Sequence, residues 1–526
     1  MKSLAQVKII GEGYGGDYTT GLTMYGSNTM HGFEESVSES NEELTVLKRQ
    51  DGPELRIFHK KSSGSDATIV ETEFRNGSSE PVTLEMLSSL VLKDIKADRI
   101  HRLLSFWSAE GRLKTEEIVS LDLERSWSGH GKRVEKFGNV GSMPVRRFFP
   151  FLALEDSRNH VFTGVQLYAP ASWQMEILSE QEGSVTITGG IADRDFGHWT
   201  KTVKPGERYL APRAILATGS TLEEVCDKLV KAQEPKTSPV DDHMGIVFNE
   251  YCTTWGNPNI DNLKKLADAI ADKGIQYLVM DSGWYGKCGD GSEWWECRGD
   301  WSINKTRFPN GLKELTDYVR AKGMIPGIWF EPEVCRDQSE IYYETDHLLK
   351  RDGVPLCVCG TRFPDMEDPW VQDFMYRNVI KTLKDNDFGY VKIDYNDAIG
   401  VGVDGPEGPG ENLWNKIRET KKFFERMREE IPELVIENCS SGGHRLEPSF
   451  MELCSQASFS DAHEAKCLPI IAANVQRVIR REQRQIWAVM RLEDDDNLFF
   501  YFLCCTFLGR LGLSGDVYDL CDHQWE

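Results

Sequence analysis

The sequence predicts two regions of different fold class, a large antiparallel β-sandwich over residues 1–235 and a (β/α)8 barrel over residues 236–526. Three observations support this division. A chain of 526 residues is too long for a single hydrophobic core. Up to residue 235, apolar and polar residues alternate in short runs. Beyond it, strand-like and helix-like segments follow one another in turn.

The first region consists of runs with a period of two, separated by Gly, Ser, Asn and Pro turns, which is typical of antiparallel strands. The runs are ATIVETEFRN, PVTLEML, HVFTGVQLYA, WQMEILSE and SVTITGGI. The segment that follows, KAQEPKTSPVDDHMG, carries two prolines and several charges, and predicts a linker.

The second region alternates buried strands with amphipathic helices. The predicted strands are GIVFNEY, IQYLVMD, MIPGIWFEPE, VPLCVCG, YVKIDYND, ELVIENC, the stretch into ASFSD, and part of NLFFYFLCCTFLGRLGLSGD. Helical patterns between them include DNLKKLADAIADKG and NLWNKIRETKKFFERMREE. About eight such units favour a closed parallel barrel over an open sheet. No glycine-rich phosphate loop follows a strand, so a nucleotide-binding fold has no support.

Composition narrows the classes of partner. The net charge of −23 disfavours nucleic acid and membrane surfaces as partners. The N-terminus has no apolar core of signal-peptide length, and no later stretch reaches the length of a membrane span. The 13 cysteines have irregular spacings without a CxxC pair, which predicts reduced thiols in a cytoplasmic protein.

Two acidic residues, Asp394 and Asp461, follow short apolar runs in the second region. Carboxyl groups at the C-terminal ends of barrel strands are placed to act in catalysis, and two facing one pocket suffice to break a glycosidic bond. The alternative is that they only cap helices or close turns. Aromatic residues near other strand ends, including Tyr251, Trp284 and Trp329, favour a sugar site, because pyranose C–H faces stack on such rings.

Several of these segments resemble those of glycoside hydrolase family 36, the family of α-galactosidases, α-N-acetylgalactosaminidases and raffinose-type galactosyltransferases. The similar segments are VMDSGWYG, RGDW, RFPNGLKEL, GMIPGIWFEPE, YVKIDYND, IENCSSGGHR and ASFSDAHE. They occur in the family's order between residues 245 and 515. The family's sandwich-and-barrel fold agrees with the fold predicted from periodicity.

The resemblance implies roles for individual residues. Asp394 matches the nucleophile and Asp461 the general acid/base of a mechanism that retains anomeric configuration. Substrate-binding positions are implied for Tyr251, Asp281, Ser282, Trp284, Trp329, Lys392, Cys439, Gly442, Gly443 and His444. No metal or cofactor is expected, because the two carboxylates supply both nucleophile and proton.

Four departures from the family pattern affect the expected sugar. Ser282 stands in place of a second aspartate, and His444 in place of a glycine near the C2 substituent. Ile393 replaces a tryptophan, and residues 462–464 replace an Asp-Thr-Asp sequence. The cleaved sugar therefore stays open between galactose and N-acetylgalactosamine.

The function expected from these features is retaining hydrolysis of terminal α-linked galactose in oligosaccharides or glycoconjugates. An α-N-acetylgalactosaminidase, a raffinose-type galactosyltransferase and an inactive carbohydrate-binding relative are the alternatives. The family's small C-terminal β domain is expected to be absent or truncated, since the sequence ends soon after the eighth predicted strand. Assembly into a homo-oligomer stays open.

Overall fold

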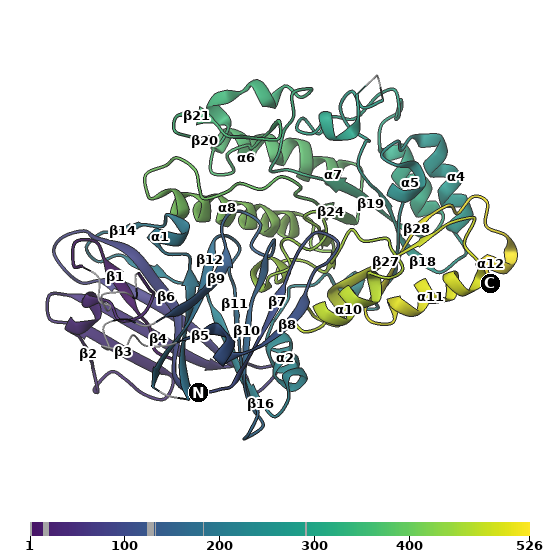
Figure 1. The fold of residues 1–526 in the computed structure, drawn as a ribbon. Helices are drawn as coiled ribbons and strands as arrows, with labels where there is room; N and C mark the ends of the chain where they lie inside the picture. The colour runs from purple at the N-terminus through teal and green to yellow at the C-terminus, as the bar shows by residue number, and fades with distance from the viewer. Residues whose placement is uncertain are drawn as a thin grey trace.

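A computed structural model describes residues 3–13, 20, 22–123, 131, 133–181, 183–289 and 292–526 of the chain. A β-rich part formed by the first half lies beside a barrel formed by the second (Figure 1). This confirms the predicted fold class. The predicted division at residue 235 falls between α2 (Leu222–Lys231) and β17 (Ile246–Asn249), and as a domain boundary it stays a prediction.

The β-rich part contains two antiparallel sheets. In the described residues, one sheet has the order β1 (Val7–Ile9), β6 (Val82–Lys96), β13 (Ser184–Ile191), β12 (Trp173–Gln181), β9 (Val134–Asn139), with β14 (Lys201–Val203) also on β6. The other has the order β2 (Phe33–Glu35), β3 (Leu44–Arg49), β4 (Pro53–Lys61), β5 (Thr68–Asn76), β16 (Ala214–Gly219), β11 (Val161–Leu167), β10 (Phe148–Asp156), β7 (Arg99–Leu104), β8 (Arg112–Glu117), with β15 (Arg208–Leu210) on β5.

The alternation seen in the sequence fills the space between these sheets. On β4, Leu55 and Ile57 are fully buried and their neighbours are partly exposed. They share one hydrophobic core with Leu84 and Leu87 of the facing sheet. A sandwich results because each sheet buries one face against the other.

The barrel is closed by parallel strands. Its order is β17 (Ile246–Asn249), β18 (Ile275–Met280), β19 (Ile325–Phe330), β24 (Tyr390–Ile393), β25 (Val435–Asn438), β26 (Gln456–Ser458), β27 (Arg484–Met490), β28 (Arg510–Gly515). Its helices are α3 (Tyr251–Thr254), α4 (Ile260–Ile270), α5 (Lys313–Ala321), α6 (Pro369–Met375), α7 (Lys381–Asp385), α8 (Pro409–Glu430), α9 (Pro448–Met451), α10 (Leu468–Val475), α11 (Asp496–Thr506) and α12 (Asp522–Trp525). The strands run in one direction, so their C-terminal ends form one rim of the barrel.

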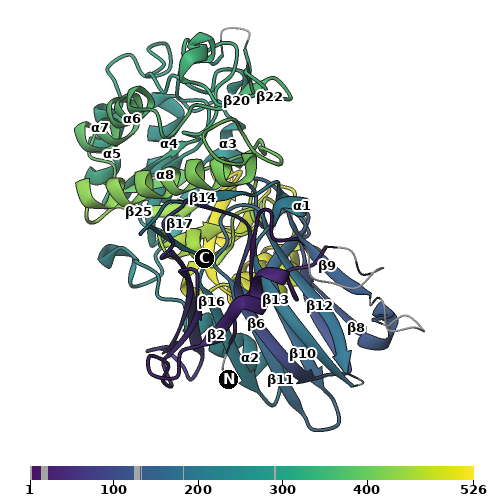
Figure 2. The same ribbon diagram turned by 90° about the vertical axis from the view of Figure 1, so that its left-hand side faces the viewer.

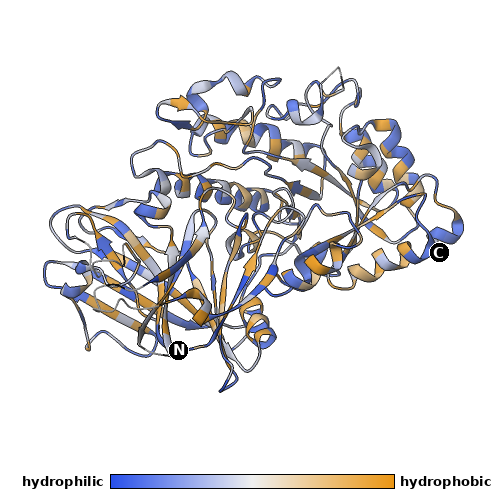
Figure 3. Ribbon diagram, viewed as in Figure 1, coloured by the Kyte–Doolittle hydropathy of each residue, from blue (hydrophilic) through white to orange (hydrophobic). Residues whose placement is uncertain are grey.

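One strand assignment from the sequence is wrong, and the assignment of the eighth strand is confirmed only for the last residues of its stretch. The run VPLCVCG does not enter the barrel, because it forms the two-residue strands β21 (Val354–Pro355) and β22 (Cys357–Val358) of small hairpins. The seventh barrel strand is instead β27, which was not predicted. The apolar run NLFFYFLCC is helix α11, largely hydrophobic in Figure 3, because Asp495 caps its first turn and only the following β28 is extended.

The two parts meet along helix α8 and at the C-terminal rim of the barrel. Figure 2 shows α8 crossing between them, and Trp199 and Tyr209 of the sandwich each donate a 2.7 Å hydrogen bond to Glu411 on this helix. Nearer the rim, the Val145 amide donates to the His444 carbonyl at 3.0 Å. The sandwich therefore reaches the end of the barrel where the predicted site lies.

Candidate active site

The predicted site residues lie together at the C-terminal rim. Asp281 directly follows β18, Asp394 follows β24, Cys439 follows β25, and Asp461 comes three residues after β26. Side chains alternate along a strand, so Lys392 on β24 faces the same way as Asp394. Lys392 pairs in register with Trp329 on β19.

Asp394 is held by several hydrogen-bond donors. One carboxylate oxygen accepts from the Tyr395 amide at 2.8 Å and the Ser441 amide at 3.1 Å. The other accepts from Asn396 Nδ2 at 2.9 Å and Trp329 Nε1 at 3.3 Å. Burial alone would raise the pKa of Asp394, but the nearby Lys392 ammonium and these donors hold that pKa below its ordinary value. Asp394 is therefore ionised at neutral pH.

Asp461 has the opposite electrostatic setting. Burial and the negative charge of Asp394 raise the pKa of Asp461 to about 6, although Lys392 acts against this. Its hydrogen bond from the described residues comes from the indole of Trp107, whose Nε1 lies 3.1 Å from Oδ2. The site thus places a carboxylate that stays ionised near a carboxyl group that binds a proton at mildly acidic pH.

A buried ion pair lies beside the two carboxyl groups. Lys392 Nζ is 2.9 Å from Asp281 Oδ2, and both side chains are about 95% buried. Asn249 Nδ2 donates to the same oxygen at 2.7 Å, and the Ser282 amide donates to the other at 2.9 Å. Burial would lower the pKa of Lys392, but the carboxylates around it raise that pKa well above its ordinary value. Lys392 is therefore a permanent cation in this site.

The glycine loop after β25 packs against Asp461 in a conformation that requires its glycines. Ser441 and Gly442 have φ of 48° and 82°. A Cβ atom on Gly442 would lie 2.6 Å from the Asp461 amide nitrogen. On Gly443 it would lie 2.5 Å from Cγ of Glu110, a sandwich residue with no exposed surface. The loop thus fits between the barrel and the sandwich only without side chains at these positions.

Three buried polar side chains of this region lack protein partners. Among the described residues, no hydrogen-bond partner is found for Ser282 Oγ, for Trp487 Nε1 or for either ring nitrogen of His444. Burial and nearby Arg146 lower the pKa of His444 to about 4, so its imidazole is neutral at pH 7. Leaving such a group unpaired costs about 1–3 kcal/mol. A ligand rich in hydroxyl groups would supply the missing partners.

An aromatic wall leads from the solvent to Asp394. Trp255 is 51% exposed, and its ring centroid lies 5.7 Å from that of Tyr251. Tyr251 is 6.3 Å from Trp294, which in turn is 5.8 Å from Trp329. Trp284 is fully buried and donates its indole N–H to the Trp329 carbonyl at 2.9 Å, so it supports this wall. Its predicted contact with substrate stays a prediction, as do the other binding roles.

Sequence reasoning missed three residues of the site. Trp107 and Glu110 belong to the sandwich segment between β7 and β8, where no motif marks them. Asn396 follows Asp394 by two residues, and its place in the YVKIDYND segment was a usable signal. The backbone N–H of Asn396 donates a hydrogen bond to Glu331 at 2.6 Å. Glu331 in turn forms an ion pair with Arg298 at 2.7 Å.

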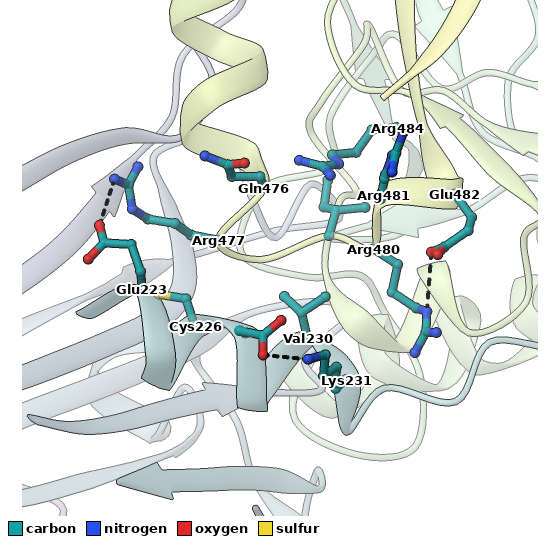
Figure 4. Close-up of a pocket in the computed structure, with 12 residues that line it drawn as sticks. Glu223, Cys226, Val230, Lys231, Gln476, Arg477, Arg480, Arg481, Glu482 and Arg484 are labelled. Atoms are coloured by element: carbon teal, nitrogen blue, oxygen red, sulfur yellow. Dashed lines mark hydrogen bonds and ion pairs between the residues drawn. The ribbon is translucent and has the colours of Figure 1, made fainter. Parts of the chain in front are cut away.

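A pocket of about 390 Å³ lies between α2 and residues 476–484 (Figure 4). Its acidic side chains Glu223, Asp227 and Glu482 each pair with an arginine or lysine. Arg484 begins β27, so this pocket is at the opposite end of that strand from the C-terminal rim. It lacks the free carboxylates that the chemistry of the first site requires.

Other features of the described residues bear on the remaining sequence predictions. No group of three or more His, Cys, Asp and Glu side chains that could hold a metal ion is found in the part of the chain that the structure describes. Likewise, none of the described helices is both long and apolar enough to cross a membrane. All 13 cysteines are free thiols in the structure.

Comparison with known proteins gives a consistent family. A sequence profile of the Melibiase family matches residues 216–477. Alpha-galactosidase Mel36A of Lactobacillus acidophilus is 24% identical over 393 residues, which cover 72% of this chain and 51% of that protein. Alpha-galactosidase AgaA of Geobacillus stearothermophilus is 25% identical over 330 residues, covering 60% of this chain and 44% of that protein. The chain spans about half the length of these relatives.

Solved structures share the fold across the whole chain. The crystal structure of the GH36 alpha-galactosidase AgaA from Geobacillus stearothermophilus has a TM-score of 0.82 at 20% identity, covering 100% of this chain and 72% of that one. The galactosidase domain of AgaSK has a TM-score of 0.81 at 18% identity, covering 100% and 71%. Variants of that AgaA were crystallised in complex with stachyose and with raffinose.

Proposed function

The chain belongs to glycoside hydrolase family 36, and from this premise we propose that it hydrolyses terminal α-linked galactose from oligosaccharides or glycoconjugates with retention of configuration. The observation that carries the proposal is the opposite electrostatic setting of Asp394 and Asp461. A retaining glycosidase needs one carboxylate that is ionised as a nucleophile and one carboxyl group that is protonated as an acid. The lowered pKa of Asp394 and the raised pKa of Asp461 support these two roles.

In the first step, an oxygen of Asp394 attacks the anomeric carbon while Asp461 gives its proton to the glycosidic oxygen. The bond to the leaving group breaks, and the sugar is held as an ester of Asp394. In the second step, Asp461 removes a proton from water, which attacks the anomeric carbon and releases the ester. Each step inverts the configuration at the anomeric carbon, so the two steps together retain it. The donors around Asp394 favour its release as a free carboxylate.

Recognition of the sugar would rest on the charged pair and on the unpaired polar groups. Asp281 and Lys392 present strong hydrogen-bond partners for hydroxyl groups on the C4 and C6 side of a hexose. Ser282 Oγ has the capacity for a further hydrogen bond on that side. The loop from Cys439 to His444 would border the C2 substituent. Trp329, which touches Asp394 through its indole N–H, would stack on the sugar ring.

Galactose is placed ahead of N-acetylgalactosamine because the named relatives are alpha-galactosidases. The complexes of AgaA variants with raffinose and stachyose support α-galactosyl oligosaccharides as the substrate class. His444 does not discriminate between the two sugars, since its neutral imidazole can hydrogen-bond to either a hydroxyl or an acetamido group at C2.

The test is a parallel assay on the p-nitrophenyl α-glycosides of galactose, N-acetylgalactosamine and glucose. We expect the galactoside to be cleaved at least about a hundredfold faster than the glucoside, which corresponds to roughly 2.7 kcal/mol in the transition state. Proton NMR should detect α-galactose as the first product. Release of β-galactose would exclude the double displacement, and a rate that depends on an added sugar acceptor would favour a galactosyltransferase.

A further inference from the structure

We propose that the sandwich segment 105–111 forms the binding site for the leaving group, with Trp107 as the platform on which a sugar leaving group stacks. The proposal rests on the proposed function, because it assigns the second half of the same site. It names the substrate class as α-galactosides whose leaving group is itself a sugar.

The position of Trp107 follows from its hydrogen bond. Its Nε1 lies 3.1 Å from Oδ2 of Asp461. A general acid must reach the glycosidic oxygen, and the leaving group begins at that oxygen. A side chain in contact with the acid therefore borders the leaving group. Trp329 has the corresponding contact with the other carboxyl group. Its indole N–H donates to Asp394, where the cleaved sugar would be bound.

The Trp107 ring has surface available for a ligand. It is 54% exposed, and the neighbouring Phe106 is 71% exposed. Single exposed aromatic residues are common on protein surfaces. Trp107 differs because one edge is fixed on the partly buried carboxyl group of Asp461 while much of the rest of the ring remains accessible. An aromatic face of this kind suits the C–H face of a pyranose.

The segment that carries Trp107 is firmly attached at both ends. The Ser105 amide donates to the Arg147 carbonyl at 2.8 Å, and the Ala109 amide closes a turn onto the Phe106 carbonyl at 2.9 Å. Glu110 accepts from the Ser108 amide at 3.0 Å. The platform is therefore preformed, which lowers the entropy lost when a sugar binds.

The barrel also holds this segment in place. Glu110 is fully buried. Its Cγ atom packs so close to Gly443 that a Cβ atom added there would lie 2.5 Å away from it. At Gly111, an added Cβ atom would lie 3.0 Å from Val475 of α10. Strand β8, which follows the segment, packs on the same helix. These contacts fix Trp107 relative to Asp461 although the two residues are 354 positions apart in the sequence.

The experiment compares two substrates that share galactose and differ in the leaving group. Raffinose has a sucrose leaving group, whereas α-galactosyl fluoride has only fluoride. We expect Trp107→Ala to lower kcat/KM for raffinose about tenfold or more, the effect of losing one aromatic contact. It should change kcat/KM for the fluoride by less than about threefold, because fluoride needs neither a platform nor a proton donor of full strength.

Two further variants separate stacking from other effects. Trp107→Phe keeps a ring face but loses the N–H, and should retain most of the activity on raffinose. Trp370→Ala removes another partly exposed tryptophan, on α6, whose ring contacts His347 and Phe374 and none of the site residues named above, and it should leave both substrates unaffected. Thermal unfolding of each variant checks that the fold is intact.

Each outcome decides the proposal. Equal losses on raffinose and fluoride in Trp107→Ala would show that Trp107 acts only through Asp461 or the fold, and would overturn it. An equally large, raffinose-selective loss in Trp107→Phe would exclude stacking as the cause. Absence of cleavage of either substrate by the unmodified protein would refute the proposed function itself, a result distinct from both.

Discussion

Replacing Asp461 by asparagine should make the protein more stable at neutral pH while it removes the proposed proton donor. The substitution preserves the shape of the side chain and an oxygen that can accept the Trp107 hydrogen bond. It also removes a group whose pKa is raised from 3.8 to about 6 in the folded protein. The burial and like charge that suit Asp461 for proton transfer therefore carry a cost in folding stability at neutral pH.

The sign and size follow from linkage. Because the folded pKa is above the unfolded one, the contribution of Asp461 to stability is complete below about pH 3.8 and is lost as the pH rises through about 6. The pKa difference corresponds to about 3 kcal/mol at most. Asp461 retains some solvent exposure, so screening reduces this to about 2 kcal/mol. The Asp461→Asn variant has no such loss, which predicts a relative gain of roughly 4 °C in its apparent Tm.

The assay is thermal unfolding of the unmodified protein and Asp461→Asn between pH 4 and pH 8, followed on the transition that includes the barrel. The Tm difference should be small at pH 4 and grow through pH 6. Asp394→Asn serves as a control of opposite sign, because the depressed pKa of Asp394 stabilises the fold above its unfolded pKa and loses this effect as pH falls. A Tm difference for Asp461→Asn that does not change with pH would refute the reasoning.

Four further outcomes follow from the site. Asp394→Asn should reduce turnover to below about a hundredth while galactose binding, measured by calorimetry, survives. Asp461→Ala should be rescued by azide on activated aryl galactosides and remain inactive on raffinose. The kcat/KM profile should fall above about pH 6 as Asp461 ionises, and fall again in acid as Asp394 is protonated. Lys392→Met should lower stability by about 3–5 kcal/mol, seen in urea unfolding, because it leaves Asp281 buried without its cation.

The sequence alone predicted those parts of the site that depend on the order of residues within a segment. Asp394 and Lys392 share a strand face because side chains alternate, and Asp281 comes at the end of an earlier apolar run. The segments that contain them keep the order of the family, so their meeting at one rim could be predicted. The resemblance implied a loop near the C2 substituent that includes Cys439, Gly442 and Gly443, and the Ser441 amide of this loop donates to Asp394.

The sequence alone did not predict contacts between residues far apart in the chain. It also did not predict the secondary structure of segments whose hydrophobic residues show no clear period. Trp107 reaches Asp461 across 354 positions, and nothing in its own segment indicates such a contact. The run NLFFYFLCC is apolar at nearly every position, so neither the strand period nor the helix period is visible in it. Strand β27 was missed because its residues RQIWAVM follow directly on a polar, arginine-rich segment.

The contact between Trp107 and Asp461 also has a consequence for the order of events during synthesis of the chain. At 5–20 residues per second, a ribosome needs roughly 20–70 s to synthesise the 354 positions that separate them. In the later part of this interval, after residue 235 has been added, all sandwich strands have been synthesised but segment 105–111 has no complete barrel to contact. The nascent chain thus carries one part of the proposed active site before the other part exists. Appearance of hydrolytic activity during synthesis would therefore mark the moment when the finished barrel docks onto a sandwich that folded earlier.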